Sequence, residues 1–361
     1  MAGVYISWPF CSQKCTYCNF ASGVFPRAAE AQYLERLLAE IRRQRWAWAP
    51  ETVYLGGGTP GSMPAETLAA ILAPVPGRPW REATLEAAPG AIQSEQVRAW
   101  REAGVNRVSL GVQSFEEAEL RRTGRRHTAE SVQSDVAVLR GEGIAEINID
   151  LIAGLPGQTR ESWRRSLDWI ARLAPPHVSV YMLEIDEDSR LGSEILQSGL
   201  RFGAPDVPAE ELIVDLYEEA VERLAALGLA RYEISNFARP GSESAHNLKY
   251  WRLEPYAGFG ADAHGFDGQT RYQNVESMAA YLAAEDPRLE ATPARLDEER
   301  FFVGLRLMAG LELTAEDEAR HAAAIAKFVK EGLLEREGGR VRLTSRGVLL
   351  SNDVFEAFLH D

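Results

Sequence analysis

The three cysteines of the chain lie within eight residues, at Cys11, Cys15 and Cys18. Random scattering over 361 residues would rarely place them so close together, so the spacing indicates a shared ligand. Thiolates are soft ligands that suit zinc and iron–sulfur clusters. A structural zinc ion or an ordinary ferredoxin cluster takes four protein ligands, and no further Cys or His lies within twenty residues. Three thiolates would leave one iron of a cluster open to an outside ligand.

The C-x3-C-x2-C spacing, on a loop directly after the first predicted strand, resembles the signature of radical S-adenosylmethionine (SAM) proteins. In that superfamily three thiolates hold a four-iron four-sulfur (4Fe-4S) cluster, whose open iron binds the amino and carboxylate groups of SAM. The resemblance implies both cofactors, with the three cysteines as cluster ligands. The alternative, three buried apolar thiols, fits poorly with the polar residues between them.

A glycine-rich run, Gly-Gly-Gly-Thr-Pro at residues 56–60, follows the second predicted strand. Residues without Cβ let a polar ligand approach the backbone closely, although such a run is often only a turn. Beside the cysteine loop, it resembles the superfamily motif that contacts the amino group of SAM. Four polar residues near other predicted strand ends could cap helices, form turns or pair on the surface, or together surround SAM: Glu86, Gln113, Arg125 and Asp150.

Positioning these residues requires a scaffold that gathers strand ends. Up to about residue 200, β-rich runs alternate with amphipathic helical segments, and parallel strands need such crossovers. The pattern predicts an α/β fold, a partial (β/α)6 barrel of TIM type, with ligands at the carboxyl ends of its strands. The predicted strands are 4–7, 52–55, 83–87, 107–112, 146–152 and 178–183; the helices are 31–45, 65–72, 94–103, 129–142 and 160–173.

The pattern changes after residue 199, which divides the chain into three predicted parts. Residues 1–200 form the barrel. Residues 201–295 form an irregular and helical extension with a helix at 209–227. Residues 296–361 form a winged-helix-like α+β module, with helices at 297–308 and 316–331 and a hairpin at 333–344 that turns at Gly-Gly.

Motifs across nearly the whole chain are similar to those of the HemN/HemW family of radical SAM proteins. This family comprises oxygen-independent coproporphyrinogen III dehydrogenases and haem chaperones. The motifs are residues 5–11 (YISWPFC), 56–60, 109–115 (SLGVQSF) and 150–159 (DLIAGLPGQT). The resemblance implies that Tyr17 lies beside the cluster and that SAM is contacted by Tyr5, Gly57, Gly58, Thr59, Glu86, Gln113, Arg125 and Asp150.

Three features favour the haem chaperones over the dehydrogenases of this family. The dehydrogenases carry a fourth Cys two residues after the third and an N-terminal extension, whereas here that position is Phe20 and the chain begins at the first strand. Residues 246–251 (HNLKYW) match the H-N-x-x-Y-W motif of the chaperones. Imidazole is a common axial ligand of haem iron, so His246 is a candidate haem ligand. The alternative is a hydrogen-bonded structural His beside two core aromatics.

The chain departs from the family pattern at two motifs. Ser7 stands where the first motif usually has His. Residues 260–265 (GADAHG) resemble the family's Gly-Ala-Gly-Ala-His-Ser, with Asp262 and Gly265 substituted, and they make His264 a second haem-ligand candidate.

Composition limits the compartment and the partners. The charge of −14 would repel nucleic acid and anionic lipid, and the sequence shows no membrane-length apolar run or signal peptide. These features predict a cytoplasmic protein without a transmembrane segment.

The leading hypothesis is a haem chaperone that binds haem, SAM and a cluster and passes haem to respiratory apoproteins, with the membrane as one candidate place of transfer. The alternatives are an oxygen-independent coproporphyrinogen III dehydrogenase, which works by radical oxidative decarboxylation, and a nucleic-acid-binding protein that uses the winged-helix-like module. Fold alone does not establish the last of these.

Overall fold

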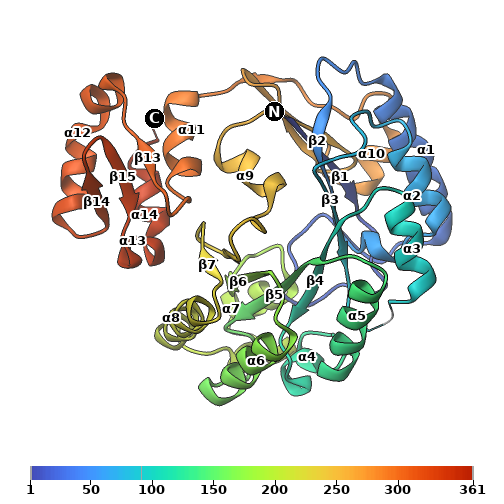
Figure 1. Cartoon of the computed structure of the whole chain (residues 1–361), viewed down its shortest axis with the longest axis horizontal. Helices are drawn as coiled ribbons and strands as arrows, with labels where there is room; N and C mark the ends of the chain where they lie inside the picture. Colours follow the sequence, from blue (N-terminus) through green and yellow to red (C-terminus); the bar gives the residue numbers. More distant parts are fainter. Residues whose placement is uncertain (1, 91, 360–361) are drawn as a thin grey trace.

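The computed structural model describes residues 2–90 and 92–359. At its centre six parallel strands follow one another in sequence order, and helices connect them on the outer face (Figure 1). The partial α/β barrel expected from the sequence is therefore confirmed, and each predicted strand overlaps an observed one. The strands are β1 (Ala2–Trp8), β2 (Pro50–Gly57), β3 (Glu82–Ala87), β4 (Arg107–Gln113), β5 (Glu146–Ala153) and β6 (His177–Met182).

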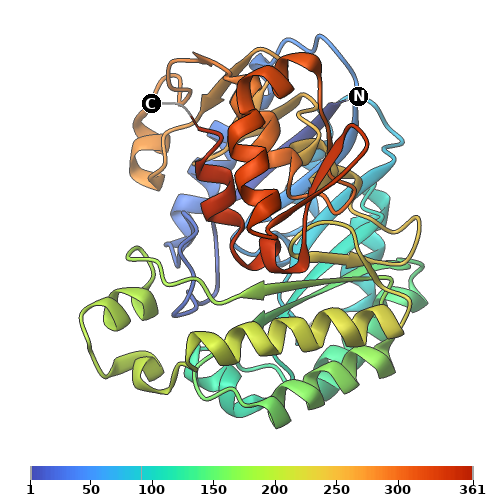
Figure 2. The ribbon, with the colours of Figure 1, turned by 90° about the vertical axis from the view of Figure 1, so that its left-hand side faces the viewer.

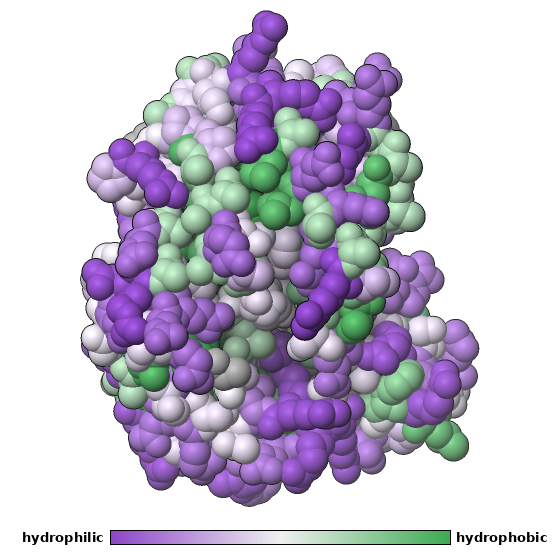
Figure 3. Space-filling model, turned by 90° about the vertical axis from the view of Figure 1, so that its right-hand side faces the viewer, coloured by the Kyte–Doolittle hydropathy of each residue, from purple (hydrophilic) through white to green (hydrophobic). Residues whose placement is uncertain are grey.

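The outer helices form where apolar residues recur at helical spacing and polar groups cap the ends. Thr128 and Thr159 each begin a helix through a capping box with the Ser three residues later. The helices that connect β1 to β6 are α1 (Arg27–Arg43), α2 (Ala65–Leu72), α3 (Ser94–Glu102), α4 (Glu117–Arg122), α5 (Ala129–Gly141) and α6 (Arg160–Leu173), with a 3-10 turn η1 (Pro60–Ser62). On the face that they form, hydrophilic side chains surround small apolar spots (Figure 3).

Alternate residues of the six strands point inward, and many of them are polar. Tyr5 of β1 stacks on Tyr54 of β2 inside the barrel, and Asn148 of β5 donates to Ser109 of β4. The other face of each strand is apolar; Trp8, for example, packs edge-on against Tyr33 of α1. The lumen is thus lined with hydrogen-bonding groups, whereas the apolar core lies between the sheet and its helices.

Residues 201–295 add strands to both edges of this sheet, which the sequence did not reveal. β9 (Tyr256–Phe259) pairs parallel with β1 and is continued by antiparallel β10 (His264–Phe266), β11 (Thr270–Gln273) and β12 (Thr292–Pro293). At the other edge β8 (Asn236–Ala238) and β7 (Ala230–Arg231) follow β6. The remaining elements are helices α7 (Arg190–Leu196), α8 (Glu210–Ala226), α9 (Ala245–Trp251) and α10 (Met278–Ala283), and the 3-10 turn η2 (Arg201–Asp206).

The C-terminal residues form a separate small layer with its own sheet. In it β13 (Leu311–Glu312), β15 (Arg340–Leu343) and β14 (Leu334–Glu337) are antiparallel, and the predicted Gly-Gly hairpin connects the last two. Figure 2 shows this module (red) beside the barrel. In the same view the carboxyl ends of the barrel strands point toward α7. Its helices are α11 (Leu296–Gly304), α12 (Ala315–Lys330), α13 (Ser345–Leu349) and α14 (Ser351–Glu356).

Candidate cofactor site at the carboxyl ends of the strands

The cysteine loop leaves β1 at the carboxyl-end mouth of the barrel and is held there by backbone hydrogen bonds. Cys11 N donates to Gly23 O at 2.9 Å, which closes the loop on itself. Thr16 N donates to Thr123 O, beyond β4, and Leu191 N of α7 donates to Thr16 O. These hydrogen bonds tie the loop to two other parts of the barrel and fix its position at the mouth.

The three thiols are half-buried and none forms a disulfide. Thr59 Oγ1 donates to Cys11 Sγ at 3.8 Å, and Cys18 Sγ lies 3.9 Å from Ser22 Oγ. Burial raises the pKa of the Cys11 thiol, and these hydroxyls oppose the shift.

This donor set fits the cluster that the sequence predicts. Within the described ranges no three Cys, His, Asp or Glu side chains converge closely enough to hold a single metal ion. Each cysteine of an iron–sulfur cube binds a different iron, so the sulfurs need to surround a cluster rather than meet at one point. Such a cluster, when bound, would supply an iron that can take a ligand from outside the protein.

The glycine-rich end of β2 packs directly against the cysteine loop. A Cβ on Gly58 would lie 2.7 Å from Phe10 O, so only glycine fits, and Gly57 has a φ of +106°. Gly58 N donates to Trp8 O at 2.8 Å and Thr59 N to Phe10 O at 2.9 Å. The run therefore places the cysteine loop over the strand ends, and these two amides are engaged within the protein.

Glu86, at the carboxyl end of β3, turns its carboxylate into the mouth of the barrel. Oε1 accepts from Tyr54 Oη at 2.8 Å and Oε2 from Gly57 N at 3.2 Å. Burial raises the pKa of Glu86 to about 7, and the negative charge of Asp150 contributes to the same shift. Tyr5 stacks on Tyr54, with ring centroids 6.1 Å apart. The expected residues Tyr5, Glu86 and Asp150 thus share one lumen.

Arg125 connects the cysteine loop to the end of β4. Its Nε donates to Tyr17 Oη at 2.9 Å and its Nη1 to Gly111 O at 2.5 Å. Gln113, two residues further on, has a φ of +70°, a left-handed conformation that is uncommon for a residue with a side chain. The Oε1 atom of Gln113 is buried without a hydrogen-bond partner among the described residues. A buried acceptor of this kind fits a site in which a bound ligand supplies the hydrogen-bond donor.

Asp150 of β5 is held by the neighbouring strands. Its carboxylate accepts from Ser109 Oγ at 3.0 Å and from Asn148 Nδ2 at 2.7 Å. Burial raises the pKa of Asp150, which these hydrogen bonds and the positive charge of Arg125 oppose.

The structure thus gathers all the expected cluster and SAM residues at one end of the barrel. Carboxylates, a guanidinium and an unpartnered amide oxygen on one rim can together recognise a ligand that carries ammonium, carboxylate and hydroxyl groups.

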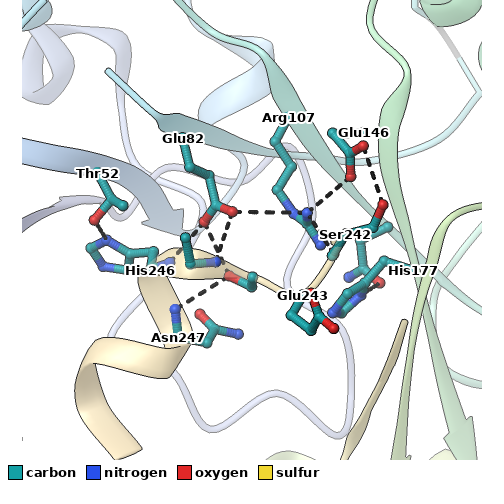
Figure 4. Close-up of polar contacts among 12 residues, drawn as sticks. Thr52, Glu82, Arg107, Glu146, His177, Ser242, Glu243, His246 and Asn247 are labelled. Carbon is teal, nitrogen blue, oxygen red and sulfur yellow. Dashed lines mark hydrogen bonds and ion pairs between the residues drawn. The ribbon is translucent and has the colours of Figure 1, made fainter. Parts of the chain in front are cut away.

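His246 lies at the opposite, amino-terminal end of the barrel. It is completely buried on α9, its Nδ1 is 2.9 Å from Thr52 Oγ1, and its Nε2 is 2.8 Å from Tyr250 Oη. Figure 4 shows the ring facing Thr52 next to the Glu82 carboxylate. With both ring nitrogens hydrogen-bonded, His246 has no nitrogen free for iron. The geometry therefore favours the structural alternative over the expected haem ligand.

Glu82 and Arg107 hold α9 in this position. The Glu82 carboxylate accepts from Ala245 N at 2.8 Å, His246 N at 2.9 Å and Ser244 Oγ at 3.2 Å (Figure 4). Arg107, whose Nη1 is 3.8 Å from Glu82, also donates to Ser242 O.

His264, the second haem-ligand candidate, is exposed at the start of β10. In the described ranges the other histidines are buried: His127, His177, His246 and His321. If haem is bound through an imidazole of the described ranges without rearrangement of the chain, His264 is the accessible one.

Several lumen residues that support the site were missed from the sequence: Tyr54, Ser109, Asn148, His177 and Ser179. One signal could have found them. Strands buried on both faces usually read as continuous apolar runs, whereas these strands alternate polar and apolar residues. That alternation predicts a polar lumen.

Within the described ranges, no helix combines the length and the apolar character that crossing a bilayer requires.

Comparisons with known proteins agree with this geometry. Residues 5–170 match the radical SAM superfamily and residues 291–350 match the HemN C-terminal domain. The heme chaperone HemW of Bacillus subtilis is 35% identical over 99% of both chains, and that of Lactococcus lactis is 34% identical over 99% of this chain and 97% of its own.

Among solved structures, coproporphyrinogen III oxidase (HemN) from Escherichia coli superimposes with a TM-score of 0.84 at 23% identity, covering 99% of this chain and 89% of that one. At this identity the likeness shows a common fold. Together with the full-length relatives, it shows that the chain belongs to the HemN/HemW family of radical SAM proteins.

Proposed function

We propose that this protein is a cytoplasmic haem chaperone that carries a 4Fe-4S cluster and SAM and delivers haem to respiratory haemoproteins. The observation that supports the cofactors is that three free thiols and four polar strand-end residues from separate segments meet at one mouth of the barrel. The haem part is supported by the full-length relatives named heme chaperone HemW.

Within this proposal Cys11, Cys15 and Cys18 bind the cluster. Arg125 and Tyr17 support the loop, since their hydrogen bond joins it to the end of β4. SAM is held by Tyr5, the backbone of residues 57–59, Glu86, Gln113, Arg125 and Asp150. Haem is the cargo, and His264, the exposed imidazole of the described ranges, is the candidate ligand of its iron. His246 would become a ligand only after α9 leaves the amino-terminal end of the barrel.

The alternative, coproporphyrinogen dehydrogenation, has one observation against it. The position of the dehydrogenases' fourth cysteine is occupied by Phe20, whose side chain is exposed on the cysteine loop.

One anaerobic experiment separates the two functions. The reconstituted protein is titrated with haem and followed by absorption, and in parallel it is incubated with SAM, a reductant and coproporphyrinogen III. The chaperone proposal expects a stoichiometric haem spectrum and no protoporphyrinogen. Formation of protoporphyrinogen at catalytic turnover would overturn it.

A further inference from the structure

A continuous chain of hydrogen bonds runs through the lumen and ends at Asp150. The amide of Asn148 lies between Asp150 and His177: its Nδ2 is 2.7 Å from Asp150 Oδ1, and its Oδ1 is 2.6 Å from His177 Nδ1. His177 Nε2 is 2.9 Å from Tyr232 Oη. His177 is almost completely buried and Asn148 nearly so, so water does not compete for the bond between these two side chains.

The direction of each bond follows from the chemistry of its ends. The Asn148 nitrogen donates to Asp150, so the Asn148 oxygen faces His177 and can only accept from it. His177 Nδ1 then carries the proton that it donates to this oxygen. Burial lowers the pKa of His177 well below its ordinary value, and the charge of Arg107 adds to that shift, so the ring is neutral and Nε2 accepts from Tyr232.

The other end of the chain reaches α9. Tyr232 Oη accepts from the backbone amide of Ser244 at 3.2 Å, and Ser244 is the residue that caps α9. Every donor therefore points in one direction, from the start of α9 to the carboxylate. Hydrogen bonds aligned in this way polarise one another, and breaking one weakens the rest.

We propose that Tyr232, His177 and Asn148 are positioning residues that orient the Asp150 carboxylate, so that SAM affinity depends on the docking of α9 at the opposite end of the barrel. This inference rests on the proposed function, in which Asp150 binds SAM. Because such coupling is reciprocal, SAM binding also tightens the docking of α9. The chain thereby links the helix that carries the H-N-x-x-Y-W motif to the cofactor site.

The test uses Tyr232→Phe in the full-length, anaerobically reconstituted protein. This variant keeps the ring and loses the hydroxyl that joins Ser244 to His177. We expect the dissociation constant of SAM, measured by calorimetry, to rise about fivefold, the lower end of typical coupling between two sites, with unchanged iron content. Hydrogen exchange of the α9 amides should slow when SAM binds to the wild type, and not when it binds to the variant.

Tyr217→Phe is the matched control. Tyr217 is a buried tyrosine of α8. Its hydroxyl donates a hydrogen bond to Ile234 O and accepts one from Arg231, and neither residue belongs to the hydrogen-bond chain that ends at Asp150. The Tyr217→Phe variant should be less stable than the wild type but should bind SAM with the same affinity. Equal weakening of SAM binding in both variants would overturn the proposal, because it would show a general effect of lost packing or stability.

SAM binding by further variants separates this inference from the function on which it rests. Asp150→Asn should weaken SAM binding, and Tyr232→Phe should add nothing in that background. If Asp150→Asn binds SAM like the wild type, the SAM role of Asp150 fails. If Asp150→Asn weakens binding while Tyr232→Phe and His177→Asn do not, only the positioning role fails.

The direction of the hydrogen bonds can be tested in the wild type. 15N-histidine spectra should show His177 protonated at Nδ1; a proton at Nε2 would contradict the proposed chain of hydrogen bonds.

Discussion

The carboxylate of Glu86 on β3 accepts a 2.8 Å hydrogen bond from the hydroxyl of Tyr54 on β2, at the mouth of the barrel. Burial outweighs this bond and raises the pKa of Glu86 from 4.5 to about 7. The folded protein therefore holds a proton there that the unfolded chain releases at lower pH. Two consequences can be measured, one for stability and one for ligand binding.

The stabilising contribution of protonated Glu86 is fully present below about pH 4.5 and is lost as the pH rises to about 7. Glu86→Gln cannot ionise, so its free energy of unfolding should fall less than that of the wild type across this interval. Urea unfolding at a series of pH values measures both. Parallel curves for the two proteins would show that the Glu86 pKa is close to its ordinary value.

SAM carries positive charge, so binding next to Glu86 should favour the ionised carboxylate. We expect SAM affinity to increase as the pH rises through about 7 in the wild type, with release of a proton, and to change little in Glu86→Gln. Calorimetry in buffers of different ionisation enthalpy detects the proton. If wild-type binding releases none, Glu86 does not face the charged part of the ligand.

Replacing Cys11, Cys15 or Cys18 by Ala should abolish the brown cluster absorption after anaerobic reconstitution, because two thiolates hold the cube poorly. Ser22→Ala is the control, since Ser22 contacts Cys18 without being a ligand, and it should keep its iron. A triple Cys→Ala variant that still binds about four irons would refute the cluster assignment.

The barrel was predictable because its strands and helices are long and regular. The sequence indicated the site residues that stand at strand ends, such as Asp150 and Gln113, since parallel strands bring those ends together. The added strands β9 to β12 were not predicted: they have two to four residues each, too few for a period to show.

The residues that support the site could be identified only from the register of the sheet. Asn148 and His177 are 29 positions apart, and only the pairing of β5 with β6 places them side by side. The role of His246 could not be read from residue type. The same imidazole beside aromatics suits a ligand or a buried structural group, and its contacts with Thr52 and Tyr250 favour the second.

Gln113→Gly should raise the stability of the protein and lower its affinity for SAM. The left-handed backbone at φ +70° costs glycine little, so the variant should gain about 1 kcal/mol in unfolding free energy. It also loses the amide oxygen that is buried without a partner, so SAM affinity should fall. Thermal unfolding and SAM titration of the same preparation check both effects. A loss of stability would mean that the side chain stabilises the strand end more than the backbone strains it.

His246→Ala should act on stability rather than on haem. The substitution leaves Thr52 Oγ1 and Tyr250 Oη without their partner in a buried place, which should lower the free energy of unfolding by about 2 kcal/mol. The haem spectrum of the folded variant should match that of the wild type, because the imidazole has no free nitrogen while α9 is docked.

His264→Ala is the comparison. The side chain is exposed, so its loss should leave stability unchanged, and the Soret band should shift if this imidazole binds the iron. The opposite pattern, a shifted Soret band in His246→Ala and none in His264→Ala, would mean that haem binding displaces α9 from the amino-terminal end of the barrel. In that case adding haem should speed hydrogen exchange in α9, and Glu82→Gln, which weakens the hold on α9, should raise haem affinity.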